Sequence, residues 1–294
     1  MEVLTGRGGG HGGVTGEYMD TCREIMLLPA LLKAATYTGL HGVFTGIPLE
    51  EIDSRCRVLD SLGQPAGSDA RAAGARQMPD LYVRFDAKKH HTYRNEKVND
   101  LYSGPADLDM AKLHGMLEGW KREHEQCAFD ALGCIRKDVH LDDFAGDTNN
   151  ESIVVKLGRV ISDTRTRYGS TITHLVMGNR MWQRCHEDPR FRGTDMPESP
   201  ADTSEVLQVP GLGCVTAVTD LMEDNGMGDV IYAVDRRRGA LYGQGRMELW
   251  LDGTSRTGGT GISEYYQYMI TDNHAKRADG EPVERRTALR IIVP

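Results

Sequence analysis

The hydrophobic and polar positions of this chain follow two periodic patterns, and each pattern predicts a different kind of secondary structure. From position 107 to position 138 one set of side chains, which includes Trp120, His124, Cys127 and Ala131, recurs every three or four residues, which is the spacing of one helical face. We interpret His124 as a structural residue of this helix. Between positions 78 and 102 apolar residues alternate with polar ones, as Leu81, Val83 and Phe85 do, and this alternation predicts a strand. A chain with both patterns is expected to belong to the α+β class.

Residues 151–193 predict a unit of helix, strand and second helix. Asn150 is a suitable N-cap for the first helix, and Pro189 ends the second. The apolar run at residues 172–177 is bounded by turn signals, which is typical of a buried strand. The rest of the chain predicts five more strands, at residues 213–218, 229–234, 241–251, 264–270 and 287–293.

Two segments carry surfaces that they cannot cover themselves. Residues 1–16 are dominated by glycine and are expected to form an arm, whereas the helical stretch at residues 17–35 is too apolar for a free arm. Residues 78–102 predict a charged two-stranded hairpin that turns near residues 87–91, and an isolated hairpin is only marginally stable in water. Contacts with another molecule are therefore expected at Arg84, Asp86, Lys88, Lys89, Tyr93, Arg94, Leu27 and Leu31.

The charge and the composition of the chain exclude several classes of protein. The formal net charge of −8 argues against a protein that reads DNA sequence through a basic face, and we interpret the run Arg236-Arg237-Arg238 as a solvated turn. The six cysteines form no Cys-x-x-Cys pair, so reduced thiols are expected rather than a zinc site. No signal peptide is evident, and no apolar run approaches the roughly 20 residues of a membrane-spanning helix. A soluble protein made in the cytoplasm is the expectation.

Three polar clusters, at residues 140–143, 186–188 and 272–274, contain the residue types that an enzyme would use. All three lie in predicted loops or at helix ends, where His and Asp side chains cap the backbone and contact water. The neighbours His90 and His91 point to opposite faces of a strand, so they are not expected to share a metal. No Gly-x-Ser-x-Gly motif is present. We therefore assign no catalytic, cofactor-binding or metal-ligating residue, and a soluble α+β enzyme stays as an alternative.

The order of the parts resembles one family. The second helix closes with Asp188-Pro189-Arg190-Phe191, and the segments GCVTAVTDLM (213–222) and GDVIYAVDRRRGALYG (228–243) follow. Together with the arm, the hairpin and the long helix, they resemble the major capsid protein of tailed bacteriophages. That protein has the Hong Kong-97 type of fold, which encapsulins share. The resemblance covers about residues 17–294.

The resemblance implies five parts of the chain. They are an N-terminal arm with its connecting segment at residues 1–77, an extended β-hairpin loop at 78–104, a peripheral domain with a long spine helix at 105–200, an axial domain at 201–262, and closing strands of the peripheral domain at 263–294.

The resemblance also implies a function. A major capsid protein assembles with itself, as pentamers and hexamers, into the icosahedral head shell of a tailed virus. The shell encloses double-stranded DNA without reading its sequence. A separate scaffold protein, a portal and decoration proteins are the further implied partners, with no cofactor and no membrane. The protein would reside in the virion after assembly in the host cytoplasm. An encapsulin-like shell around a protein cargo stays open as the nearest alternative.

Some members of the family join their subunits covalently, from a Lys of the extended loop to an Asn of a neighbour. Lys88, Lys89, Lys97 and Asn179 offer these groups. The sequence does not show a desolvated Glu beside such a pair, so we expect the subunits to be held without covalent links.

Overall fold

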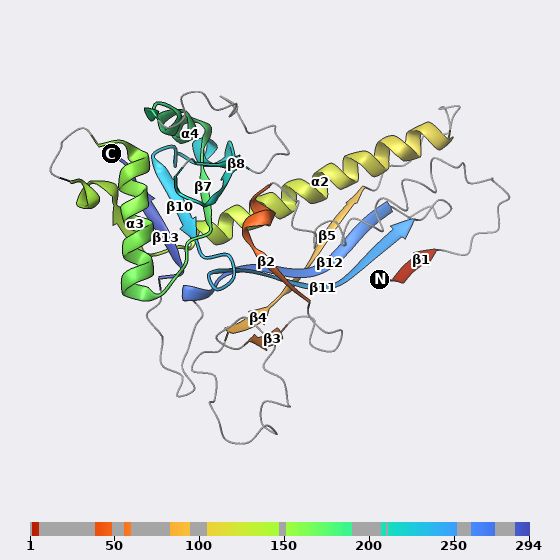
Figure 1. Cartoon of the computed structure of the whole chain (residues 1–294). Helices are drawn as coiled ribbons and strands as arrows, with labels where there is room; N and C mark the ends of the chain where they lie inside the picture. Colours follow the sequence, from red (N-terminus) through yellow and green to blue (C-terminus); the bar gives the residue numbers. More distant parts are fainter. Residues whose placement is uncertain are drawn as a thin grey trace, which may run out of the picture.

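The chain folds into two β-sheets that share one long helix, α2 (Pro105–Gly133), as the computed structural model shows (Figure 1). A third, two-stranded sheet lies below them in this view. The structure describes residues 2–5, 39–48, 56–59, 83–94, 105–146, 151–189, 207–209, 211–251, 260–273 and 286–294.

The first sheet, here called the long sheet, is built on an antiparallel pair, β11 (Ala240–Leu251) and β12 (Thr260–Ile270). The strand β5 (Lys88–Arg94) pairs with the other edge of β12 and is antiparallel to it. The free side of β11 pairs in parallel with two short strands, β1 (Glu2–Thr5) and β2 (Thr45–Pro48). Segments from widely separated parts of the sequence therefore meet in one sheet.

The second sheet has six strands in the order β6 (Asp138–His140), β13 (Ala288–Ile292), β10 (Val230–Val234), β7 (His174–Met177), β9 (Val215–Val218) and β8 (Leu207–Gln208). Its central strand β10 is apolar along its whole length because both of its faces are covered. Successive side chains of β10 point to opposite faces, so Ile231 and Ala233 pack in one core cluster and Tyr232 and Val234 in another.

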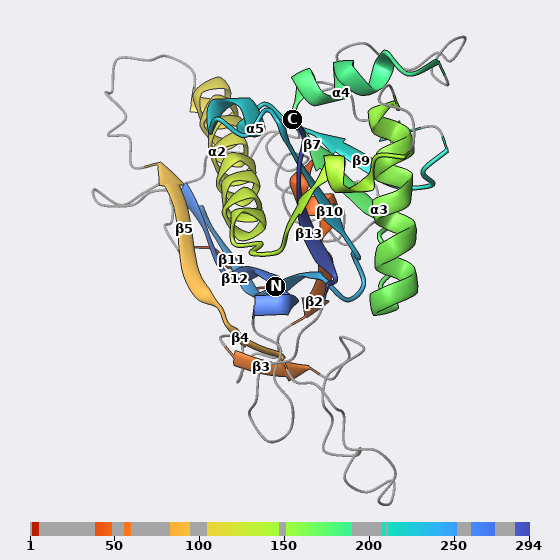
Figure 2. The ribbon, with the colours of Figure 1, turned by 90° about the vertical axis from the view of Figure 1, so that its left-hand side faces the viewer.

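Two helices cover one face of the six-stranded sheet (Figure 2). They are α3 (Ile153–Tyr168) and α4 (Asn179–His186), and their buried residues include Leu157 and Trp182. The sequence correctly predicted this order of helix, strand and helix. The N-cap of α3 is Ser152 rather than Asn150, because the Ser152 hydroxyl accepts the hydrogen bond from the Val155 amide.

The long helix α2 connects the two sheets. Trp120 and His124 pack against the long sheet, and Ala128 and Leu132, one and two turns later, pack in the core on the second face of the six-stranded sheet. Trp120 and His124 lie on the stripe that the sequence predicted, but further along the helix the buried residues are Ala128 and Leu132, and the predicted Cys127 and Ala131 are only partly buried. No helix in the described ranges is both long and apolar enough to cross a membrane.

The predicted hairpin at residues 78–102 is wrong in its pairing. The strand β4 (Val83–Asp86) continues through Ala87 into β5 without a turn, and the two strands have different partners. β4 is antiparallel to β3 (Cys56–Leu59), and β5 lies on β12. The physical reason is burial: Phe85 and Ala87 are at most 3% exposed, so this stretch runs through the core instead of turning outward.

The sheets also divide the chain differently from the expected boundaries. Strands β8, β9 and β10, expected in an axial domain at residues 201–262, share the six-stranded sheet with β7 and β13. Strand β11, from the same expected domain, belongs to the long sheet. The reason is that hydrogen bonding joins strands across long sequence distances, as in the parallel pair of β7 and β9.

Candidate functional site

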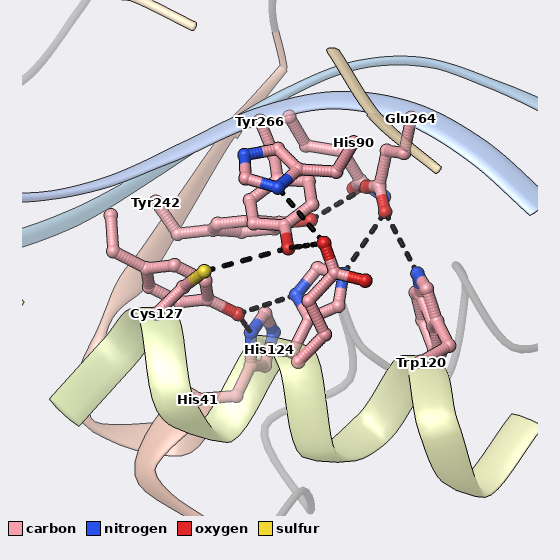
Figure 3. Close-up of polar contacts among 11 residues, drawn as sticks. His41, His90, Trp120, His124, Cys127, Tyr242, Glu264 and Tyr266 are labelled. Carbon is pink, nitrogen blue, oxygen red and sulfur yellow. Dashed lines mark hydrogen bonds and ion pairs between the residues drawn. The ribbon is translucent and has the colours of Figure 1, made fainter. Parts of the chain in front are cut away.

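A buried cluster of polar side chains lies between α2 and the long sheet (Figure 3). Its strand residues sit at alternate positions of β12 and β11 and so share one face, and its helix residues lie one turn apart on α2. One more member comes from η1 (Leu40–Val43). We call this set the Glu264 cluster; it consists of His41, Trp120, His124, Tyr242, Gln244, Glu264, Tyr266 and Tyr268.

Glu264 is the centre of the cluster and accepts four hydrogen bonds. Its Oε1 accepts from the Tyr242 hydroxyl at 2.7 Å and from Gln244 Nε2 at 2.9 Å. Its Oε2 accepts from His124 Nε2 at 3.1 Å and from Trp120 Nε1 at 3.2 Å. The residue is 1% exposed, so these four donors replace its water shell.

The four donors keep Glu264 ionised inside the protein. Burial by itself would raise the pKa of Glu264, but the hydrogen bonds from His124, Tyr242 and Gln244, together with the charge of His124, outweigh burial and hold the pKa below its ordinary value. Burial, and then the charge of Glu264, raises the pKa of Tyr242 well above its usual range, so that phenol stays a donor.

A chain of hydrogen bonds continues from Glu264 to η1. Because a carboxylate only accepts, His124 Nε2 donates to it, and His124 Nδ1 lies 2.7 Å from the Tyr268 hydroxyl. The same hydroxyl lies 2.6 Å from His41 Nδ1. Tyr268 has one proton for two ring nitrogens, so one of these nitrogens carries a proton and donates to the tyrosine oxygen. The chain thereby links η1, β12 and α2.

Tyr266 joins β5 to the same helix. Its ring is stacked between His90, with centroids 4.0 Å apart, and His124, with centroids 4.2 Å apart. The Tyr266 hydroxyl donates to Glu123 Oε1, which also accepts from His90 Nδ1 at 2.9 Å. Cys127 lies 3.7 Å from that hydroxyl. Three elements are thus fixed around one ring.

The arrangement is suited to holding the elements together rather than to acting on a substrate. Each carboxylate oxygen of Glu264 accepts two hydrogen bonds, and the side chains of His124, Tyr242 and Tyr266 are at most 2% exposed. A hydrogen bond to a charged group contributes about 1.5–3 kcal/mol to stability when its geometry is good. Among the described residues, no group of three or more His, Cys, Asp or Glu side chains could hold a metal ion.

The residues that the sequence put forward for contacts lie mostly elsewhere. Lys88 and Lys89 are exposed on β5, and the Lys89 ammonium lies 5.5 Å from the centre of the Tyr265 ring. Arg84 and Asp86 lie on β4 and Tyr93 and Arg94 on β5, while Leu27, Leu31 and Lys97 lie outside the described residues.

The three polar clusters predicted from the sequence make separate local contacts in the structure. Asp142 pairs with Lys156 at 2.8 Å, and His186 packs against the Trp182 ring. Asp272 accepts hydrogen bonds from the amides of Thr287 and Ala288, which is the capping role expected for it. His274 lies outside the described residues.

Sequence reasoning missed Glu264 as a central residue. It placed Trp120, His124 and Cys127 on one helical stripe, and interpreted His124 as structural, which the contacts support. The available signal was the spacing of Glu264 and Tyr266, which a strand places on the same face. The sequence pattern did not indicate that this face of β12 packs against α2, because His124 and Glu264 are 140 positions apart in the sequence.

We predict that Glu264→Gln lowers the free energy of unfolding at pH 7 by about 3–5 kcal/mol, because the amide of Gln cannot accept all four hydrogen bonds, and each buried donor left without an acceptor costs about 1–3 kcal/mol. The pKa of Glu264 is lower in the folded protein than in the unfolded chain, so its contribution is present above about pH 4.5 and is lost as the pH falls through the folded value.

Urea unfolding of both proteins from pH 7 to pH 3 measures this, and the difference between them should shrink toward the acid end. The comparison cancels the contribution of His174, whose pKa burial lowers to about 4 in both proteins. Glu123→Gln, on the half-exposed side of α2, is the matched control and should cost much less. An equal loss in the two variants would contradict the central role of Glu264.

Comparisons with known proteins agree on the fold. The head structure of Helicobacter pylori bacteriophage KHP40 matches with a TM-score of 0.54 and 8% identity, over 84% of this chain and 88% of that chain. The capsid of a native GTA particle matches with a TM-score of 0.51 and 12% identity, over 88% and 90%. A phage-related protein from Bordetella bronchiseptica RB50 matches with a TM-score of 0.50 and 10% identity, over 90% and 96%.

No family model and no curated protein matches the sequence. The structural matches nevertheless span most of both chains in each case, and they include a phage head and a particle capsid. The predicted fold class is thereby confirmed: the chain has the α+β fold of phage capsid proteins, of the Hong Kong-97 type.

Proposed function

We propose that this chain is the major capsid protein of a tailed virus, and that it assembles into an icosahedral head shell around double-stranded DNA. The observation that carries the proposal is the match over most of its length to capsid structures, although sequence identity is about 10%. The shell would be built from pentamers and hexamers of this chain. A scaffold protein, a portal and decoration proteins would act with it, during assembly in the host cytoplasm and in the finished virion.

The geometry supports a structural role. The Glu264 cluster is buried, and its central carboxylate accepts four hydrogen bonds. These hydrogen bonds hold α2 against the long sheet. A shell subunit needs such a rigid frame, because the same contact must form many times with the same geometry. We therefore propose a non-enzymatic shell protein.

The pairing of β3 with β4 supports a revised position for the extended loop. These strands pair only with each other among the described residues, and they lie apart from α2 on the lower side of Figure 1. Residues 60–82 connect them in the sequence. We propose that the paired strands β3 and β4 belong to the extended loop that contacts a neighbouring subunit, in place of a hairpin at residues 78–104.

We predict that the purified chain forms closed shells with rings of five and six subunits. Size-exclusion chromatography with light scattering and electron microscopy would measure this. Particles recovered from the producing cells should hold nuclease-protected double-stranded DNA. A chain that stays monomeric at high concentration would contradict the proposal, and a protein cargo inside the particles would favour the encapsulin-like alternative.

We also predict that replacing residues 60–82 with a short Gly-Ser linker leaves a folded subunit that no longer builds shells. The change removes the sequence that joins β3 to β4 and keeps β5, whereas a deletion at residues 88–94 would remove a strand of the long sheet. Circular dichroism and thermal melting test folding, and microscopy tests assembly, with the unmodified chain as control. Normal shells from the linker variant would rule out the revised position of the extended loop.

A further inference from the structure

A cluster of arginines gathers at one end of the six-stranded sheet, although the whole chain is acidic. The cluster combines the last turn of α3, the turn between β10 and β11, and the start of the final described segment. We call it the arginine surface; it consists of Arg165, Arg167, Tyr168, Arg236, Arg237, Arg238 and Arg286.

Backbone contacts hold this surface in place. The buried carboxylate of Asp235 accepts hydrogen bonds from the amides of Arg237 at 3.2 Å and Arg238 at 3.3 Å, which fixes the turn and leaves both side chains exposed. Arg238 also reaches the carbonyl oxygen of Gly169 at the end of α3, at 3.5 Å. The arginines are therefore presented by a defined turn.

Most arginines of this surface form no ion pair with another described residue. Within the described ranges, Arg167 pairs with Asp163, but no ion pair is recorded for Arg237 or Arg238. The Nε atoms of Arg236 and Arg286 are buried and have no acceptor. Burial lowers the pKa of Arg236, as expected for a cation that has lost water without gaining a counter-charge.

An exposed aromatic ring lies in the middle of these charges. Tyr168 is the only large hydrophobic side chain that is exposed in the described part of the chain, at 37%. The guanidinium of Arg286 lies 4.4 Å from the centre of its ring. Tyrosine and arginine are the residue types that are enriched at the energetic centres of protein interfaces. The composition therefore fits a contact with another protein surface.

The opposite end of the same sheet carries exposed carboxylates. The short helix α5 (Leu221–Asp224) comes just before β10, whereas the arginine turn follows the end of β10. Figure 2 shows α5 at the top and the turn between β10 and β11 at the bottom. Asp220 precedes α5 as its N-cap and Asp224 is its last residue, and both are exposed. Asp220 accepts a hydrogen bond from Asn179 Nδ2, but among the described residues neither carboxylate forms an ion pair. Arg180 and Arg184 also lie at this end, but both pair with Asp229 at 3.6 Å, which leaves Asp220 and Asp224 without an ion pair there.

We propose that the arginine surface of one copy binds the carboxylates of Asp220 and Asp224 on α5 of the next copy. Guanidinium groups match carboxylates through paired hydrogen bonds, and the contact would join charges that form no ion pair among the described residues. A contact between two different ends of the same chain repeats head to tail and can close a ring. The inference rests on the proposed shell function and names one of its contacts.

A charge-swap experiment tests this pairing. Arg237→Glu with Arg238→Glu, and separately Asp220→Arg with Asp224→Arg, should each raise the critical concentration for assembly at least about tenfold, because two attractions become repulsions. Combining all four changes should restore assembly to within about threefold of the unmodified chain. Arg237→Lys with Arg238→Lys keeps the charge and is the matched control. Thermal melting confirms that each variant is folded.

The outcomes separate the inference from the function it rests on. Sedimentation velocity of the unmodified chain comes first, and a chain that forms no oligomer contradicts the proposed function itself. If it assembles and the glutamate variant assembles equally well, the inference is overturned. The same holds if the four changes together do not restore assembly. Loss of binding to a short DNA duplex with normal assembly would instead assign the surface to nucleic acid and overturn the pairing.

Discussion

The structure depends on one buried carboxylate. Glu264 lies on β12 where α2 crosses the long sheet, and its charge is tolerable there only because four donors from α2 and β11 surround it. Removing one partner from such a pair costs several kcal/mol, since the remaining charge stays buried. The helix and the two long strands are therefore stable only together. Tyr268 and Tyr266 extend the same constraint to η1 and to β5.

This constraint fits the proposal that the outer parts of the chain act as separate contact surfaces. The cluster fixes α2 to the long sheet, and the next turns of α2 form the core on one face of the six-stranded sheet. With the centre rigid, the paired strands β3 and β4 and the arginine turn lie toward one side of the molecule, and α4 and α5 toward the other (Figures 1 and 2). A shell needs this division, because each subunit must bind a neighbour on both sides.

Local pattern was enough to predict much of the fold. The period of the apolar residues gave α2, α3 and the central strands, because burial on a defined face leaves a regular trace in the sequence. The order of these elements also indicated the capsid fold. The pairing of strands was harder to predict. Alternation of apolar and polar residues at positions 83–94 indicates strands, but it does not indicate which strands they pair with. The Glu264 cluster depends on such pairings. The sequence therefore predicted its helix and its strands, but not that their side chains come together at Glu264.

Native-state hydrogen exchange tests the central claim most directly. If Glu264 joins the helix to the sheet, the slowest amides of α2 and β12 open with the same free energy in the unmodified chain. In Glu264→Gln their protection should then fall together, at least about tenfold, while the amides of α3 keep most of theirs. Protection that falls in β12 alone, with α2 unchanged, would contradict the account.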